Sequence, residues 1–213
     1  MNLTATEALE RLRYGNRRFV ADMPNSRALA GSERRAQIAS AQRPFAIVLG
    51  CADSRAPAEI LFDQGLGDLF VIRVAGNIVA PSLVGSVEFA ADKFATRLVV
   101  VMGHTRCGAI EATVDVVANP DRTVSPGIAA IVERIRPSVA RLFDGGHVSD
   151  AASLRRAAMR LNVMASAAHL RSDSEILARL IADDGLLIVG AEYDVETGLV
   201  DFFDGVPQEA SPR

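Results

Sequence analysis

Cysteine is scarce in this chain of 213 residues, which contains only Cys51 and Cys107, and tryptophan is absent. Two cysteines cannot form the disulfide framework that small secreted domains need. Their scarcity points to a reducing compartment and to a chemical use for the two thiols. Lysine is rarer still, because Lys93 is the only one, so arginine carries almost all of the positive charge.

Long apolar runs are also missing. No stretch approaches the roughly 18 consecutive apolar residues that a membrane-spanning helix needs, and the start of the chain contains acids but no apolar core of a signal peptide. The net charge of −3 is too small to indicate a nucleic-acid or acidic-membrane partner. We therefore expect a cytoplasmic protein that binds neither nucleic acid nor membrane.

Two segments of the chain share an abrupt layout. Residues 45–56 read FAIVLGCADSRA, and residues 98–109 read LVVVMGHTRCGA. Each is an apolar run without polar alternation, which is typical of a parallel strand buried on both faces. Each run stops at a glycine and then presents chemically reactive side chains. Both cysteines of the chain lie at these two strand ends.

Strands and helices alternate along the chain, which predicts a single α/β domain over residues 1–213. The sheet is expected to be mainly parallel and flanked by helices, with an antiparallel edge strand at its C-terminal side. Residues 1–43 are expected to form an arginine-rich helical arm that either attracts anions or packs on a partner subunit, and residues 207–213 a flexible tail. Strands are expected near 45–50, 68–77, 98–103 and on both sides of a turn at 196–198, and helices near 3–20, 57–68, 81–95, 109–117, 127–143, 150–169 and 172–184.

The reactive side chains at the two strand ends fit a metal site. The carboxyl ends of parallel strands meet at one edge of a sheet, so Cys51, His104 and Cys107 are expected to lie together. Two thiolates and one imidazole suit zinc, and three protein ligands leave a fourth position open, as in catalytic zinc sites. Singly, each cysteine would be interpreted as a small buried residue and His104 as a core histidine. Their joint placement favours the metal site.

Asp53 and Arg55 follow Cys51 closely in the sequence, and three interpretations of this pair are open. They form an ordinary salt bridge, or Arg55 holds the Asp53 carboxylate beside the metal, or Asp53 itself takes the fourth zinc position. Two thiolates cancel the charge of Zn²⁺, so a bound water is acidified less than beside three histidines, and an alkaline pH optimum is expected. Our hypothesis is that this pair selects between an open and a closed zinc site.

The motifs CADSR at 51–55 and GHTRCGA at 103–109 resemble the β-class carbonic anhydrase family, whose signatures are C-x-D-x-R at a strand end and G-H-x-x-C-G in a turn. The similarity covers most of residues 5–203. It includes the segments GNRRF at 15–19, FDQGLGDLFVIRVAGN at 62–77, GSVEFA at 85–90 and YDVETGLV at 193–200.

This resemblance implies a zinc ion held by Cys51, His104 and Cys107. It also implies reversible hydration of carbon dioxide to bicarbonate and a proton by zinc hydroxide. In that scheme Asp53 accepts a hydrogen bond from the hydroxide, and Arg55 orients Asp53.

The resemblance further implies a substrate pocket. Gln42 matches a glutamine that contacts substrate, and Gly108 matches a glycine beside the zinc. Phe70 and Phe89 match an apolar pocket wall, part of which comes from a partner chain in this family. Without the resemblance, both phenylalanines are more simply core residues. Family members form dimers or larger even oligomers, so a homodimer or tetramer is expected here.

Some departures from the family pattern bear on function. Ala52 stands where serine is commoner, and Val74 where many members have asparagine. A chain without tryptophan cannot build the bicarbonate pocket by which some members close the site. Three alternatives stay open: hydrolysis of carbonyl sulfide or carbon disulfide on the same fold, a non-catalytic zinc domain closed by Asp53, and a redox pair of the two cysteines.

Overall fold

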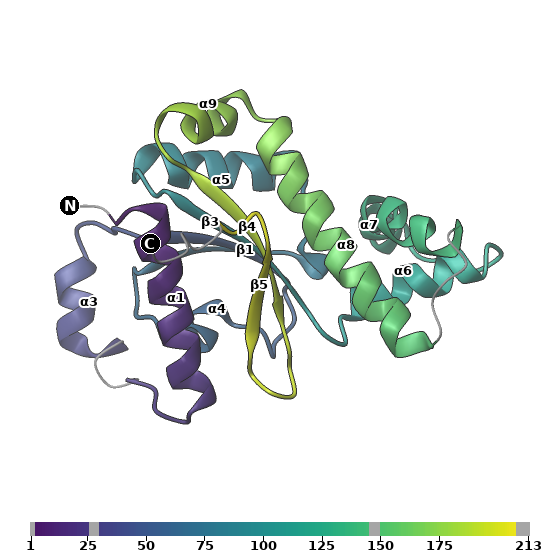
Figure 1. Ribbon diagram of the computed structural model, residues 1–213, viewed down its shortest axis with the longest axis horizontal. Coiled ribbons are helices and arrows are strands. Elements are labelled where there is room, and N and C mark those ends of the chain that lie inside the picture. The colour runs from purple at the N-terminus through teal and green to yellow at the C-terminus, as the bar shows by residue number, and fades with distance from the viewer. Residues whose placement is uncertain (1–2, 26–29, 145–149, 208–213) are drawn as a thin grey trace, which may run out of the picture.

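The computed structural model describes residues 3–25, 30–144 and 150–207 (Figure 1). The tail expected at 207–213 lies, apart from residue 207, outside the described residues. The helices are α1 (Ala5–Val20), α3 (Ser32–Ile38), α4 (Ala58–Leu61), the short 3-10 helix η1 (Ala75–Asn77), α5 (Pro81–Lys93), α6 (Gly108–Ala118), α7 (Pro126–Asp144), α8 (Ala151–Ser172) and α9 (Glu175–Asp183). The strands are β1 (Ala46–Gly50), β2 (Leu69–Arg73), β3 (Leu98–His104), β4 (Leu187–Tyr193) and β5 (Val200–Asp204).

The five strands form one sheet in the order β2-β1-β3-β4-β5. The first four run parallel, and β5 pairs antiparallel with β4 at the edge. This confirms the expected α/β fold with a mainly parallel sheet and an antiparallel C-terminal edge strand. The register places Gly50 of β1 beside Met102 of β3, so the segments that follow both strands emerge at the same end of the sheet.

Two expected elements are shorter than predicted. The helix expected over 57–68 covers only Ala58–Leu61, because the backbone turns away at Asp63, which has a φ of 47°. The strand expected over 68–77 ends at Arg73, and η1 follows it with a φ of 70° at Gly76. That turn changes the chain direction directly beside the end of β1.

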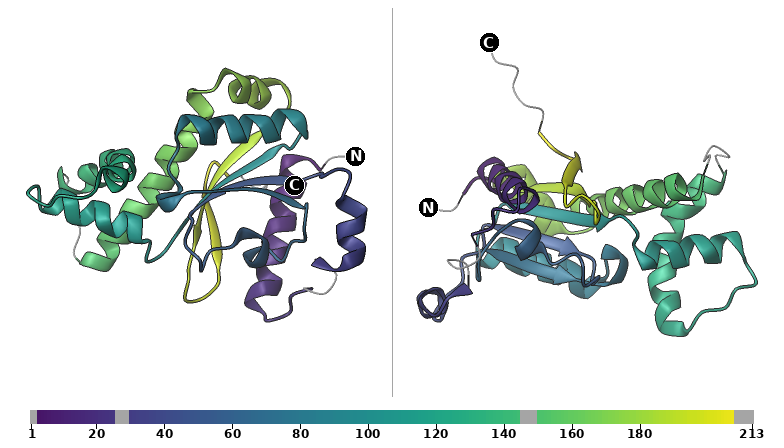
Figure 2. Two further views of the ribbon diagram at one scale, coloured as in Figure 1. Left: turned by 180° about the vertical axis from the view of Figure 1, so that it is seen from behind. Right: turned by 90° about the horizontal axis from the view of Figure 1, so that it is seen from below.

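Helices cover both faces of the sheet. Alternate strand residues such as Ile47 and Val99 pack with α5, α6, α7, α8 and α9 in one cluster. Their neighbours, such as Val48 and Val100, pack with α1 and α4 in the other. The two-sided burial explains why these strands lack polar alternation. On one side of the molecule α6, α7 and the start of α8 extend beyond the end of the sheet (Figures 1 and 2).

The first helix begins at Ala5, close to the start expected near residue 3. Thr4 and Glu7 form a complete capping box at its N-terminus. Several arginines of the arm pair with aspartates of the same chain: Arg18 with Asp63, and both Arg11 and Arg34 with Asp68. These contacts tie α1 and α3 to the loop after α4 and use part of the positive charge of the arm within the chain.

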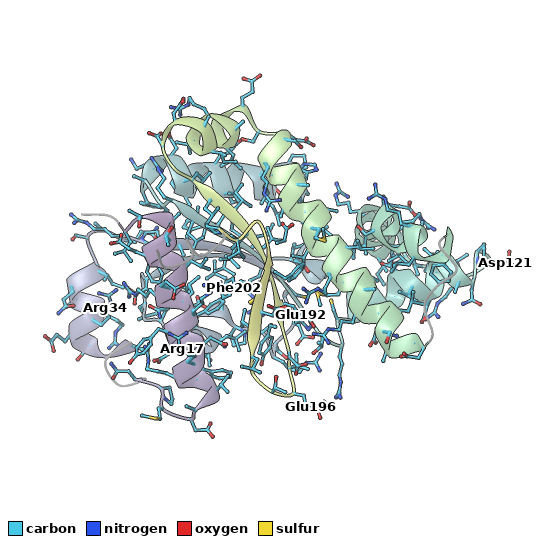
Figure 3. The ribbon with its side chains drawn as sticks, viewed as in Figure 1. Arg17, Arg34, Asp121, Glu192, Glu196 and Phe202 are labelled. Carbon is cyan, nitrogen blue, oxygen red and sulfur yellow. The ribbon has the colours of Figure 1, made fainter. Side chains whose placement is uncertain are left out.

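An ion cluster fixes α8 to the sheet. Glu192 of β4 is buried between the hairpin and α8 (Figure 3), and its two oxygens accept hydrogen bonds from Arg156 and Arg160. Arg160 also contacts Asp201 of β5 at 2.9 Å. A buried carboxylate needs such partners to offset its lost hydration. The cluster therefore sets the position of α8 beside β4.

Asn16 joins α1 to two distant segments. Its Nδ2 donates to the carbonyl oxygens of Leu61 and Gly198 at 3.1 and 2.9 Å, and its Oδ1 accepts from the Val200 N–H at 3.0 Å. Asn16→Ala leaves these groups without their partner, so we expect a loss of about 2–4 kcal/mol in the free energy of unfolding. Thermal unfolding should show a midpoint lowered by about 5–15 °C. The adjacent, exposed Arg17→Ala is the control, and equal midpoints for the two variants would contradict the assigned role.

In the described parts of the chain, no helix is both long enough and apolar enough to cross a membrane.

Candidate metal centre

Three ligand-type side chains meet where β1 and β3 end. Cys51 follows β1 directly, His104 is the last residue of β3, and Cys107 caps the N-terminus of α6. The two sulfur atoms lie 3.9 Å apart. The ligand atoms of all three side chains lie within 4.8 Å of one another, and all three residues are buried. The structure thus brings together the three residues that the sequence indicates as metal ligands.

The imidazole of His104 is set for binding through one nitrogen. Its Nδ1 lies 2.9 Å from the carbonyl oxygen of Thr105, which fixes the proton on that nitrogen. Its Nε2 is buried and has no hydrogen-bond partner among the described residues. Thr105 is itself held by β4, because its N–H donates to the carbonyl of Tyr193 and its hydroxyl accepts from the Val195 N–H. A buried nitrogen with a free lone pair beside two thiols is the arrangement that a metal ion would satisfy.

The two cysteines are free thiols, and their separation of 3.9 Å is far from the roughly 2.05 Å of a disulfide bond. A hydrogen bond from the Cys107 thiol lowers the pKa of Cys51 to about 4, with help from His104 and from the N–H of Gly76. Donation of that hydrogen bond, together with burial, raises the pKa of Cys107. The pair therefore holds one shared proton, which a coordinating dication would displace.

Burial lowers the pKa of His104, but the adjacent Cys51 sulfur and its charge, the Thr105 carbonyl and the charge of Asp53 together outweigh that effect, so the pKa is raised overall. The imidazole and the Cys51 thiolate stabilise each other in their charged forms. A cation at this position would take the place of the imidazole proton and bind both groups.

The Asp53 carboxylate faces Arg55. Its two oxygens accept from Nε and Nη2 of Arg55 at 2.9 and 2.8 Å, and Oδ1 also accepts from the Arg55 backbone N–H. Arg55 is steadied by a further bond of 3.1 Å to the carbonyl of Arg106. These contacts hold the pKa of Asp53 well below its usual range. Asp53 Oδ2 lies 3.8 Å from His104 Nε2, next to the three-ligand cluster but not part of it.

Two further residues shape the site and were not predicted from the sequence. Arg73, the last residue of β2, donates to the carbonyl oxygens of Cys51 and Asp53 at 2.9 and 2.5 Å. Gly76 donates its backbone N–H to the sulfur of Cys51 at 3.4 Å. The sequence shows Arg73 as an arginine at the end of an apolar strand. The carbonyl groups that it contacts become evident only from the pairing of Gly50 with Arg73.

Three of the four predicted substrate residues lie apart from this cluster, whereas Gly108 directly follows the ligand residue Cys107. Gln42 is exposed and precedes β1, whereas Cys51 follows it, so the strand alone separates them by roughly 16 Å. Phe70 lies at the start of β2 and packs against Phe89 of α5, with ring centres 6.3 Å apart. The interpretation of Phe89 as a core residue is wrong, because its side chain is 54% exposed. Gly108 is exposed as the first residue of α6 and borders open space.

A cavity of about 370 Å³ adjoins the cluster on the side of α6 and α8. His104 and Cys107 form part of its wall, together with Arg106, Arg155 and Arg156. A larger cavity of about 730 Å³ lies between α5, α7 and α8, and none of the three ligand residues lines it. The smaller cavity is the one relevant to chemistry at the cysteines.

Gly76 is required by both conformation and space. Its φ is 70°, and a β-carbon there would lie 2.7 Å from Ile135 Cδ1. Left-handed strain costs roughly 1–2 kcal/mol and overpacking roughly 1–3 kcal/mol, so Gly76→Ala should lower the free energy of unfolding by about 2–4 kcal/mol. Gly85→Ala is the control, because nothing lies within 4 Å of its added carbon and alanine favours the helix. Denaturant unfolding measures both, and an unchanged midpoint for Gly76→Ala would contradict the close fit.

Comparison with known proteins assigns this architecture to a family. The family model for carbonic anhydrase matches residues 46–200. Carbonic anhydrase of Mycolicibacterium smegmatis is 39% identical over 210 residues, which cover 94% of each chain. Carbonic anhydrase 2 of Mycobacterium tuberculosis is 38% identical over 199 residues, which cover 92% of each chain.

Solved structures agree with the sequence relatives. A β-carbonic anhydrase of Aspergillus fumigatus matches with a TM-score of 0.72 at 24% identity, over 96% of this chain and 92% of that one. The Coccomyxa β-carbonic anhydrase in complex with acetazolamide matches with a TM-score of 0.70 at 25% identity, over 89% of this chain and 83% of that one. The chain therefore belongs to the β class of the carbonic anhydrase family.

Proposed function

We propose that this protein is a zinc-dependent carbonic anhydrase that interconverts carbon dioxide with bicarbonate and a proton. The observation that carries the proposal is the buried, unpartnered Nε2 of His104 within 4.8 Å of two thiols. Membership of the family supports the reaction, and the donor set of one imidazole and two thiols supports zinc. Cys51, His104 and Cys107 would hold the ion.

In this proposal zinc supplies a Lewis acid that makes a water molecule nucleophilic toward carbon dioxide. Asp53 would orient the attacking water molecule. Its carboxylate is ionised, so it accepts hydrogen bonds and donates none, and it can fix the proton of the attacking water on one side. Arg55 donates to both carboxylate oxygens and thereby holds Asp53 in one orientation, with Oδ2 3.8 Å from His104 Nε2.

A comparison of substrates tests the proposed reaction. One zinc-loaded preparation is assayed by stopped flow for carbon dioxide hydration, and by product analysis for hydrolysis of carbonyl sulfide and carbon disulfide. We expect hydration of carbon dioxide to dominate and to rise toward the alkaline end of roughly pH 6 to 9. Hydrolysis of the sulfur compounds without hydration would replace the proposal with the hydrolase alternative. Stoichiometric zinc without any turnover would support a closed, non-catalytic domain.

We also infer that the protein self-associates as a homodimer or tetramer. The strand β2 is an edge of the sheet, and the exposed Phe89 lies beside it with Phe70. Gln42 and these phenylalanines lie away from the cluster of their own chain, so they can line a zinc site only in a second copy. The β-carbonic anhydrases of Sordaria macrospora, which share the fold, are described as tetrameric. Light scattering at micromolar concentration should give an even oligomer, and a monomer would contradict the inference.

A reducing compartment such as the cytoplasm suits the proposed site. Zinc needs both cysteines as thiolates, and oxidation of either sulfur would remove a ligand. The two thiols of this chain are buried, which limits their access to oxidants.

A further inference from the structure

Helix α8 directs two polar side chains into an apolar interface. Asn162 and Ser166 are 2% and 6% exposed, and they lie one turn apart on the same face as the core residues Met159, Val163 and Leu170. A buried amide or hydroxyl lowers stability unless it finds a partner. Both find one in the same short segment, because Asn162 Nδ2 donates to the carbonyl of Gly76 at 2.8 Å and Ser166 Oγ to the carbonyl of Asn77 at 3.2 Å.

That segment, η1, supplies a hydrogen bond to the metal-ligand cluster. The N–H of Gly76 donates to the sulfur of Cys51 at 3.4 Å. The turn also stays in register with β1, because Val74 exchanges backbone hydrogen bonds with Gly50 and Ala52. A continuous chain of contacts therefore runs from α8 through Gly76 to the sulfur of Cys51.

We propose that Asn162 is a positioning residue of the metal centre, which holds the Gly76 carbonyl so that the Gly76 N–H stays directed at the Cys51 thiolate. Ser166 supports the same turn one residue further along. The inference rests on the proposed zinc-dependent function and adds a role for α8, which carries none of the three ligands.

The need for an outside anchor follows from the nature of glycine. Gly76 lacks a β-carbon and adopts left-handed and right-handed conformations with similar ease, so its own side chain does not fix the direction of its N–H. The tight packing of Ile135 and Ala109 against its α-carbon limits translation of the residue. Asn162 supplies the remaining restraint by fixing the orientation of the following peptide group.

An N–H donor on a metal-bound thiolate matters for the ion. It stabilises the negative charge on sulfur and favours the deprotonated ligand, and outer contacts of this kind typically change metal affinity by about 10–100-fold. The other N–H on Cys51 comes from Asp53, which is held by Arg55 and Arg73 rather than by α8. Loss of Asn162 should therefore weaken one of the two N–H donors and leave the other in place.

The test compares Asn162→Ala with Leu170→Ala in the full-length protein. Leu170 is fully buried on the same helix, and its aliphatic side chain forms no hydrogen bond to η1, so its truncation lowers stability through the cavity that it leaves. Two quantities are measured for each variant. The zinc-loaded protein gives the rate of zinc transfer to a chromophoric chelator, and the cobalt-loaded protein gives the energy of the thiolate-to-cobalt charge-transfer band. Ser166→Ala is measured in parallel as a milder change.

For Asn162→Ala we expect zinc release about 10-fold faster than in wild type and a charge-transfer band at longer wavelength, because an unbonded thiolate gives up its electron more easily. Ser166→Ala should shift both readouts in the same direction by a smaller amount. If Asn162→Ala does not fold, Ser166→Ala alone tests the inference. Leu170→Ala should unfold at lower temperature with wild-type release and band. Wild-type release and band in Asn162→Ala or Ser166→Ala would overturn the inference. Failure of the wild type to bind either metal would instead refute the proposed function.

Discussion

Replacing His104 with alanine is expected to abolish zinc binding and carbon dioxide hydration together. The Nε2 of His104 is the one buried ring nitrogen in the described residues that has no hydrogen-bond partner, and it faces the two sulfurs of the cluster. Its removal leaves two ligands, too few for a stable tetrahedral zinc site. Zinc affinity should fall by more than the roughly 100-fold that loss of an outer contact costs.

The measurement is zinc per chain after dialysis, paired with the hydration rate of the same sample. His169→Ala is the matched control, because His169 is exposed on α8 and pairs only with Asp173 among the described residues. The control should keep one zinc per chain and the wild-type rate. Stoichiometric zinc in His104→Ala would show that the ion is held elsewhere.

Replacing Asp53 with asparagine is expected to separate zinc binding from catalysis. The variant keeps the three ligands, so zinc content should stay at one per chain. Asparagine has nearly the same shape but only one acceptor oxygen, so the two-point contact with Arg55 is lost and an amide N–H₂ can face the cluster. We expect kcat to fall by roughly 10²–10³-fold, the usual effect of losing one oriented catalytic contact.

The pH dependence sharpens this prediction. Arg55 holds the pKa of Asp53 well below its usual range, so the carboxylate is ionised throughout roughly pH 6 to 9. The loss in Asp53→Asn should therefore be similar across that range rather than confined to one end. Glu196→Gln, the same chemical change on an exposed carboxylate at the tip of the β4–β5 hairpin (Figure 3), should leave the rate unchanged. Full activity in Asp53→Asn would remove Asp53 from the mechanism.

Much of the site was predictable because it is local in sequence. Cys51 follows an apolar strand directly, and the three-residue spacing of His104 and Cys107 lies within one turn. Parallel pairing of the two strands then follows from their continuous apolar character, since such strands are buried on both faces. The capping box of Thr4 and Glu7 was predictable for the same reason, because all of its contacts lie within four residues.

The remaining parts depend on contacts between distant segments. Arg73 reaches the carbonyl of Cys51 only because β2 pairs in register with β1, and a shift of one residue would turn it to the other face. Asn162 contacts Gly76 across 86 positions, which no local pattern encodes. The exposure of Phe89 depends on which face of α5 meets the sheet, and the apolar residues Val87 and Ala90 stand on either side of it in the sequence.

The most direct test of the proposed zinc site is a zinc titration of metal-free protein, followed at each step by the rate of carbon dioxide hydration. The rate is expected to rise linearly and to stop rising at one zinc per chain, because the described residues contain one cluster of three ligand side chains around His104. A rate independent of added zinc, or a full complement of zinc with no hydration, would contradict it.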